Sequence, residues 1–422
     1  MPAIPCDPAA ARRFALGVVE RLRAAGHEAL WAGGCVRDEL LGRTPADYDV
    51  ATSARPDQVR AVFGQRRTLA VGAAFGVITV LGPREAGQVE VATFRSDAAY
   101  TDGRHPAGVT FTDAREDALR RDFTINGLFL DPVSGAVHDY VAGRADLAAG
   151  VVRAIGTPGM RFAEDHLRML RAVRFAAVFD FALEEQTAAA IARMAHLATS
   201  VSPERIAAEL RAMVARPGRR RALELLEQTG LARSVFPELL AAGAADVAAW
   251  REAARVVAAL DEPELSLTLA ALTASRPAEV PRQIATRLRL SSRERDHACW
   301  LHAAVPAVAG PAVPAPAGRP WSEVQPWLKH AAAPLLADLL RGRAACGLGD
   351  SAAAAWVTDR VRLPRERLDP PPLLTGDDVL AAGVPAGRAV GRVLDEARSL
   401  QLDGVLATAP QARAWLASRP RG

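Results

Sequence analysis

The pattern of hydrophobic and polar positions divides the chain into a mixed first part and a helical second part. In the first 150 residues, short apolar runs typical of strands alternate with apolar positions at helical spacing. The expected helices cover residues 10–26, 35–41 and 56–63, and the expected strands cover residues 27–32, 48–52, 76–81, 88–94 and 109–112. A polar loop, residues 96–108, interrupts this series. The first part therefore predicts an α+β fold around one small mixed sheet.

The second part begins at about Val151, where stretches rich in Ala, Leu and Arg repeat at helical period and β-rich runs become scarce. We therefore expect this part to be all-helical. Two stretches rich in Pro, Ala or Gly, residues 305–320 and 363–372, predict linkers or long loops between groups of helices.

Length and composition narrow the class of protein. A chain of 422 residues predicts about three domains at roughly 150 residues each. With 50% hydrophobic and 24% charged residues, it is globular rather than disordered. Because no apolar run could span a bilayer and the first residues lack the features of a signal peptide, we expect a cytoplasmic protein that makes no membrane contact. Four scattered cysteines argue against a zinc ribbon or a disulfide framework, and a net charge of +4 is weak evidence for nucleic acid.

Two carboxylates, Asp47 and Asp49, flank Tyr48, so on a strand their side chains share one face. They repel each other unless a cation lies between them. Such a pair suits a hard divalent metal, Mg²⁺, with triphosphate oxygens completing the coordination. Two metal ions held this way activate an attacking oxygen and stabilise a leaving pyrophosphate. Taken alone, however, the pair is better explained as a solvated edge strand, because D-x-D occurs often by chance.

Gly33 and Gly34 precede the carboxylates, at an expected strand-to-helix junction. Glycines there let backbone N–H groups approach a phosphate, and the helix N-terminus adds partial positive charge. Arg37 lies on the first turn of the expected helix, where its guanidinium could reach a triphosphate. The series G-G-x-V-R-D, L-L-G-R, D-x-D and A-T is far more specific than any one of its parts, so it favours a functional site over a tight turn.

Three long motifs carry a family resemblance. Residues 31–52, WAGGCVRDELLGRTPADYDVAT, resemble the signature of the class II tRNA nucleotidyltransferase and bacterial poly(A) polymerase family. Residues 120–132, RRDFTINGLFLDP, and residues 161–177, RFAEDHLRMLRAVRFAA, resemble it too, whereas residues 373–391 do so more weakly. The resemblance is strong over about the first 215 residues.

This resemblance implies a small nucleotidyltransferase head followed by an elongated helical neck, body and tail. On this basis we expect four parts: a catalytic head (1–150), a base-recognising neck (151–215), a body (216–305) and an RNA-binding tail (321–422). The glycines and arginines of residues 376–392 fit an RNA-contacting turn and a helix-capping loop equally well.

The family's motif residues can be carried over position by position. The resemblance implies that Asp47 and Asp49 bind the catalytic metals. Positions that match or adjoin its nucleotide contacts are Gly33, Gly34, Arg37 and Arg121.

Two further residues in the first part have open interpretations. Asn126 could bond a ribose hydroxyl, while Asp122, four positions earlier, fits a helix cap better than a ligand contact. Glu90 is a candidate third carboxylate beside the metals, but strand alternation equally allows it to face solvent.

Base choice without a template needs a donor and an acceptor in the right order. Cytosine and adenine each offer an exocyclic amino donor beside a ring-nitrogen acceptor, whereas uracil and guanine offer the reverse. A carboxylate only accepts and a guanidinium only donates, so an Asp/Arg pair suits C and A. Asp165 and Arg168, three apart on an expected helix, could form that pair, and the resemblance assigns them this role. It also implies nucleotide contacts for Arg171 and Arg174; alternatively, Glu164 and Arg168 are a surface ion pair.

The charged loop after residue 97 contains Asp102 and Arg104 and is long enough to cover a site. In the family, a loop here helps the switch to adenosine, and enzymes that add only CC have a shortened one. Here the loop looks intact, which argues against a CC-only enzyme.

Together these features predict template-independent addition of CCA to the 3′ end of tRNA from CTP and ATP, with two Mg²⁺ ions and no evident protein partner. An A-adding tRNA enzyme and a bacterial poly(A) polymerase share this chemistry and stay open as alternatives. A nucleotidyltransferase for a small molecule is disfavoured by the long helical part, and an inert RNA-binding protein by the intact D-x-D.

Overall fold

The computed structural model describes residues 7–97, 108–215, 217–241, 243–261, 264–310 and 315–419. The chain folds into two units, Met1–Pro237 and Glu238–Gly422, which we describe separately. The expected division into head, neck, body and tail is finer than this and stays a prediction. Among the described residues, no helix combines the length and apolar character that crossing a bilayer requires.

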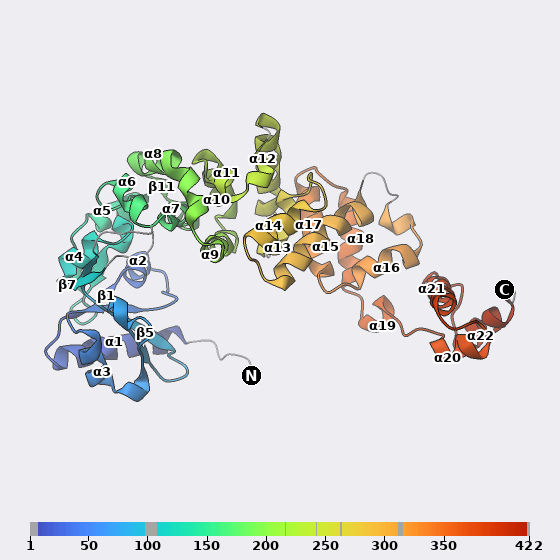
Figure 1. The fold of residues 1–422 in the computed structure, drawn as a ribbon, viewed down its shortest axis with the longest axis horizontal. Coiled ribbons are helices and arrows are strands. Elements are labelled where there is room, and N and C mark those ends of the chain that lie inside the picture. The colour runs from blue at the N-terminus through green and yellow to red at the C-terminus, as the bar shows by residue number, and fades with distance from the viewer. Residues whose placement is uncertain are drawn as a thin grey trace. The chain divides into compact units, whose positions relative to one another are not determined.

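The first unit begins with a seven-stranded sheet (Figure 1). In spatial order its strands are β3 (Thr68–Leu69), β4 (Val77–Leu81), β5 (Gln88–Thr93), β2 (Asp49–Thr52), β1 (Ala29–Ala32), β8 (Leu128–Leu130) and β9 (Val137–Asp139). β2 and β5 run parallel, while the other neighbouring pairs are antiparallel. The predicted mixed sheet is therefore confirmed, and its parallel pair sets Asp49 directly opposite Glu90.

Three helices of this region match the sequence-based expectations within two or three residues at their ends: α1 (Pro8–Ala24), α2 (Gly34–Leu40) and α3 (Pro56–Phe63). The apolar stripe of α1 is buried, as its helical spacing predicts. The expected polar loop starts with a strand, β6 (Arg95–Asp97), which pairs antiparallel with β7 (Val109–Phe111). The predicted loop residues Asp102 and Arg104 lie outside the described residues.

Helices fill the rest of the first unit: α4 (Ala114–Leu119), α5 (Gly143–Ala149), α6 (Pro158–Glu164), α7 (Leu167–Phe179), α8 (Glu185–Met194), α9 (Pro203–Val214), α10 (Arg219–Gln228) and α11 (Leu231–Val235). One small exception to the all-helical expectation is a two-stranded parallel sheet of β10 (Val151–Val152) and β11 (Ala182–Leu183). The central helix α7 is buried along most of its length, so it forms the core of this region.

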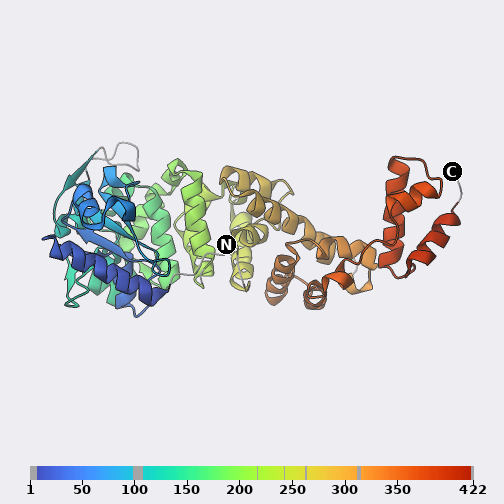
Figure 2. The same cartoon turned by 90° about the horizontal axis from the view of Figure 1, so that it is seen from below.

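The described part of the second unit is helical: α12 (Ala244–Ala258), α13 (Leu265–Leu272), α14 (Val280–Arg287), α15 (Ser292–Ala309), α16 (Trp321–Leu328), α17 (Ala333–Ala345), α18 (Ser351–Val361), α19 (Arg365–Leu368), α20 (Gly376–Ala381), α21 (Arg388–Leu402) and α22 (Ala409–Ala417). The last three, red in Figure 2, share a core that includes Val379, Val393 and Leu416.

The predicted breaks at 305–320 and 363–372 were partly wrong. α15 continues to Ala309 with Pro306 inside it, and the second break contains α19. A proline inside a helix costs roughly 3 kcal/mol relative to alanine. Leu301, Ala304 and Val308 of α15 are fully buried, so their packing offsets that cost.

Candidate active site

A cavity of about 600 Å³ in the first unit collects eleven of the residues that the sequence nominates. These are Gly33, Gly34, Arg37, Asp47, Asp49, Arg121, Asn126, Asp165, Arg168, Arg171 and Arg174. Five lining residues were not nominated: Arg120, Asp122, Leu167, Phe175 and Arg205. The described lining thus contains seven arginines but only four aspartates, an excess of positive charge that suits a polyphosphate.

Gly33 forms the junction between β1 and α2, as predicted. Its φ of 72° lies in the left-handed region that disfavours side chains. A Cβ added here would lie 2.7 Å from Nη1 of Arg121. The backbone conformation of this turn therefore favours glycine, and a side chain here would also displace the tip of Arg121.

Arg37 lines the cavity, but its side chain is largely buried and is held by protein groups. Its Nη1 donates to Oδ1 of Asn126 at 2.7 Å and its Nε donates to Oδ1 of Asp38 at 2.8 Å. The guanidinium carbon lies 4.4 Å from the ring centre of Phe179. Burial lowers the pKa of Arg37, and the neighbouring Asp38 opposes that shift. This guanidinium is fixed in place before any ligand arrives.

Asp47 and Asp49 line the cavity, but only Asp49 belongs to β2, so the expected alternation along one strand holds in part. Burial raises the pKa of Asp49 to about 6, and repulsion from Asp47 and Glu90 adds to that shift. Glu90 is exposed beside Asp49 on the neighbouring strand. No three His, Cys, Asp or Glu side chains in the described ranges already form a metal-ligand cluster.

Asp165 and Arg168 do not share a helix, contrary to the sequence-based expectation. Asp165 has extended backbone angles (φ −150°, ψ 104°) at the end of α6, and Arg168 lies in the first turn of α7. Asp165 pairs with Arg205 of α9, whereas Arg168 pairs with Glu164 at 2.5 Å. The Glu164–Arg168 ion pair of the alternative prediction is thus present, although Arg168 also lines the cavity and is not a surface residue.

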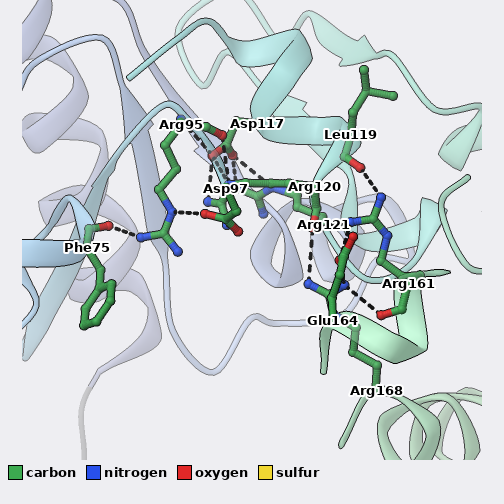
Figure 3. A network of polar contacts seen from close by, with 10 residues as sticks. All are labelled: Phe75, Arg95, Asp97, Asp117, Leu119, Arg120, Arg121, Arg161, Glu164 and Arg168. Carbon is green, nitrogen blue, oxygen red and sulfur yellow. Dashed lines mark hydrogen bonds and ion pairs between the residues drawn. The ribbon is translucent and has the colours of Figure 1, made fainter. Parts of the chain in front are cut away.

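A polar network connects Arg168 to α4 (Figure 3). Arg168 donates to the backbone carbonyl of Arg120, which also accepts a hydrogen bond from Arg161. The Arg120 side chain in turn contacts Asp117 at 2.7 Å and Asp97 of β6 at 3.5 Å. Burial alone would raise the pKa of Asp117, but the two adjacent guanidinium groups of residues 120 and 121 lower it.

Asp122 fixes two of the predicted nucleotide contacts. Its Oδ1 accepts from Nδ2 of Asn126 at 3.1 Å and from the backbone N–H of Phe123, and its Oδ2 accepts from Arg171. Burial would raise the pKa of Asp122, yet the guanidinium of Arg171 and these hydrogen bonds hold it at about 2. Asp122 therefore has the structural role expected for it, and that role is to position Asn126 and Arg171. Arg174 is held by Glu209 at 2.6 Å.

Sequence reasoning missed Arg120 and Arg205. Arg120 had a local signal, since it adjoins Arg121 and is three residues from Asp117, a helical ion-pair spacing. Arg205 had none, because it lies 40 positions from Asp165, beyond the reach of any local period.

Two family models match the chain. The "Poly A polymerase head domain" matches residues 29–153, and the "Probable RNA and SrmB- binding site of polymerase A" matches residues 180–242.

Among curated proteins, the chain is 42% identical over 218 residues to the CCA-adding enzyme of Geobacillus stearothermophilus, covering 51% of this chain and 53% of that protein. It is 39% identical over 239 residues to Poly(A) polymerase I of Haemophilus influenzae, covering 54% and 52% respectively. The matched region spans about half the length of each of these relatives.

A solved structure extends the similarity to nearly the whole chain. The crystal structure of the Bacillus stearothermophilus CCA-adding enzyme in complex with CTP superposes with a TM-score of 0.77 and 30% identity, over 97% of this chain and 98% of that one. The chain belongs to the class II tRNA nucleotidyltransferase and bacterial poly(A) polymerase family. Its mixed-sheet head followed by helices is the family's architecture, and the cavity described above lies in the unit that contains this head.

Proposed function

We propose that this protein adds CCA to the 3′ end of tRNA from CTP and ATP, releasing pyrophosphate at each step. The observation that supports this most directly is the composition of the cavity. It contains Asp49, whose pKa is raised to about 6 by burial and neighbouring carboxylates, and Asp165, in a lining rich in arginine. The carboxylates at Asp47 and Asp49 suit phosphate chemistry, and Asp165 suits recognition of a base edge.

The carboxylates of Asp47 and Asp49 fit a divalent metal site, with Mg²⁺ as the proposed ion. Their donor atoms are all oxygens, which hard cations prefer. Burial and then repulsion from Asp47 and Glu90 raise the pKa of Asp49, and a bound cation would offset that repulsion. When bound there, the metal would activate the attacking 3′-hydroxyl and stabilise charge on the departing pyrophosphate.

In the proposed reaction, the tRNA 3′-hydroxyl oxygen forms a bond to the α-phosphorus of CTP or ATP, and the bond from that phosphorus to pyrophosphate breaks. The buried guanidinium of Arg37 and that of Arg121 would neutralise the triphosphate in fixed positions. Asp165 would accept a hydrogen bond from the amino group of the base, and Arg168 would donate one to the ring nitrogen of the base. Binding of tRNA would depend mostly on phosphate contacts and hence on salt.

The relatives support CCA addition over its alternatives without excluding them. The G. stearothermophilus relative is named a CCA-adding enzyme, and the B. stearothermophilus structure is described in complex with CTP, a substrate that a poly(A) polymerase or an A-adding enzyme does not need. The H. influenzae relative keeps poly(A) synthesis as the second candidate. The four-part division, the roles of individual residues and the cytoplasmic location remain part of the proposal.

Incubation with a tRNA that ends at the discriminator base, followed by sequencing of the products, tests the proposal. With all four NTPs and Mg²⁺, we expect C, C and A to be added in that order and addition then to stop. Long A tails, also on unrelated RNA, would instead support poly(A) polymerase activity, and addition of A only to tRNA ending in CC would support an A-adding enzyme.

A further inference from the structure

The acidic group proposed to read the base is held by an arginine from a distant helix. Arg205 of α9 forms a bidentate contact with Asp165: its Nη1 donates to Oδ1 at 3.1 Å and its Nη2 donates to Oδ2 at 2.7 Å. Arg205 lines the same cavity and is about a quarter exposed, at 26% of its side chain. The contact therefore lies inside the nucleotide cavity, not on the outer surface.

The hydrogen bonds at Asp165 leave its two oxygens in different states. Oδ1 accepts twice, from Arg205 and from the backbone N–H of Leu167 at 3.1 Å. Among the described residues, Oδ2 is assigned one donor, Arg205. Because a carboxylate oxygen accepts about two hydrogen bonds, Oδ1 is saturated and Oδ2 keeps one acceptor position open.

A two-point contact also fixes the plane of the carboxylate. The single bond from Leu167 would leave the group free to turn about its Cβ–Cγ bond, whereas a fork of two parallel N–H groups defines one orientation. Arg168 is anchored separately, by Glu164 and by the backbone carbonyls of residues 120 and 161. The acceptor and the donor of the base-reading pair are thus positioned from different helices.

We propose that Arg205 is a positioning residue for base choice, which holds Asp165 so that Oδ2 presents its open acceptor position to the exocyclic amino group of cytosine or adenine. The inference rests on the proposed function, because it assumes that Asp165 reads the base. It assigns discrimination against U and G to a pair of residues 40 positions apart in the chain.

Nucleotide binding to the full chain without RNA tests this assignment apart from catalysis. Calorimetric affinities for CTP and UTP are compared for wild type, Arg205→Gln, Arg205→Lys and the control Arg220→Gln. Arg220 is a half-exposed arginine that pairs with Glu224 on α10 and does not line the cavity. We expect wild type and the control to prefer CTP, and Arg205→Gln to lower the CTP/UTP affinity ratio roughly tenfold or more.

The lysine variant separates charge from geometry. Lysine keeps the positive charge but cannot form the planar fork, so Arg205→Lys should restore only part of the ratio. If Arg205→Gln does not fold, Arg205→Lys alone tests the positioning role. An unchanged ratio in the folded variants, with weaker binding of all nucleotides or of tRNA alone, would overturn the proposal and make Arg205 a structural or RNA-contacting residue.

The same proteins distinguish this inference from the proposed function. Wild type that prefers CTP through Arg205 but transfers no nucleotide to tRNA would support the positioning role while refuting CCA addition. If wild type adds CCA but the Arg205 variants keep full CTP preference, CCA addition would be supported and the positioning role of Arg205 refuted.

Discussion

Each unit of the molecule contains a large cavity, and the two differ in what lines them. The cavity of the first unit, about 600 Å³, is lined by seven arginines and four aspartates among the described residues. The cavity of the second unit, about 480 Å³, is lined mainly by small and aliphatic side chains, with His302, Arg343 and Asp350 as its charged or titratable members. Size therefore does not distinguish a site from a packing gap here; converging charged groups do.

The family models show the same contrast. They match residues 29–153 and 180–242, nearly all within the first unit, although 97% of the chain superposes on a family structure. A metal-binding carboxylate has few substitutes, whereas a helix in a scaffold needs only apolar residues at the right spacing. A chemical role therefore limits which residue types can occupy a position in the first unit. In the second unit, packing limits only the spacing of apolar positions.

The largest effect is expected from Asp49→Asn in the cavity of the first unit. Removing the negative charge of a carboxylate proposed to bind metal should lower kcat for CTP addition roughly a thousandfold or more, as loss of other essential catalytic groups does. The matched control is Asp57→Asn, an exposed carboxylate on α3, for which we expect unchanged kcat. Gel-based primer extension measures both. More than a tenth of wild-type activity in Asp49→Asn would contradict the assignment.

Substitutions in the core of the second unit should lower the stability of the protein and leave its base choice unchanged. Leu301 of α15 is fully buried, so Leu301→Ala should lower the free energy of unfolding by about 2–5 kcal/mol. Leu380→Ala, at an exposed position of α20, serves as the control with a change of no more than roughly 0.5 kcal/mol. Urea denaturation gives both values. A changed CTP/UTP preference in Leu301→Ala would show that the two units are not separable in this way.

The carboxylate pair should also leave a signature in the pH dependence of stability. The pKa of Asp49 is raised from its ordinary 3.8 to about 6 by burial and by Asp47 and Glu90. The folded state therefore holds this proton more tightly than the unfolded state. Protonated Asp49 therefore adds up to about 3 kcal/mol to the free energy of unfolding. This contribution is fully present below about pH 4 and is lost as the pH rises through 6.

Comparing melting curves of wild type and Asp49→Asn between pH 4 and 8, without metal, checks this. We expect the variant to be the more stable protein at pH 7.5 although it is inactive, and the difference to shrink toward pH 4. Mg²⁺ should raise the Tm of wild type and not that of the variant. A variant that is less stable than wild type at pH 7.5 would mean that Asp49 is compensated within the protein.

A smaller effect is expected at Asp165, the residue proposed to read the base. Asp165→Ala should lower the kcat/KM ratio of CTP to UTP by roughly ten- to hundredfold, while transfer itself persists. Because Asp165 and Arg205 form one pair, adding Arg205→Gln should change the ratio little further. Single-nucleotide kinetics on tRNA ending at the discriminator base give the values. Additive losses from the two substitutions would indicate that they act separately.

Local features of the site could be predicted from the sequence, and contacts between distant segments could not. Gly33 and Asp49 follow from a strand, a turn and the next strand, so short-range rules were enough to nominate them. Arg205 reaches Asp165 only because α9 packs beside α7, which no periodicity reports. The separation of Asp165 from the helix of Arg168 was missed because helical spacing continues across the break.

The fold shows the same limit. Most predicted helices and strands of the first 150 residues are present, because alternation and helical spacing reflect burial on one face. Pro306 misled the prediction in the second unit, since proline ends most helices but the buried face of α15 stabilises this one. Where packing outweighs a local preference, the sequence alone predicts the wrong boundary.

If one cavity serves both phosphate chemistry and base choice, as we propose, CTP and ATP must compete for it. Titration of CTP into the full chain with Mg²⁺, followed by ATP, UTP or GTP as competitor, counts the sites and ranks the bases. We predict one CTP per chain, displaced by ATP but far less readily by UTP or GTP. Separate sites for CTP and ATP, or displacement by UTP as effective as by ATP, would show that one cavity does not serve both purposes.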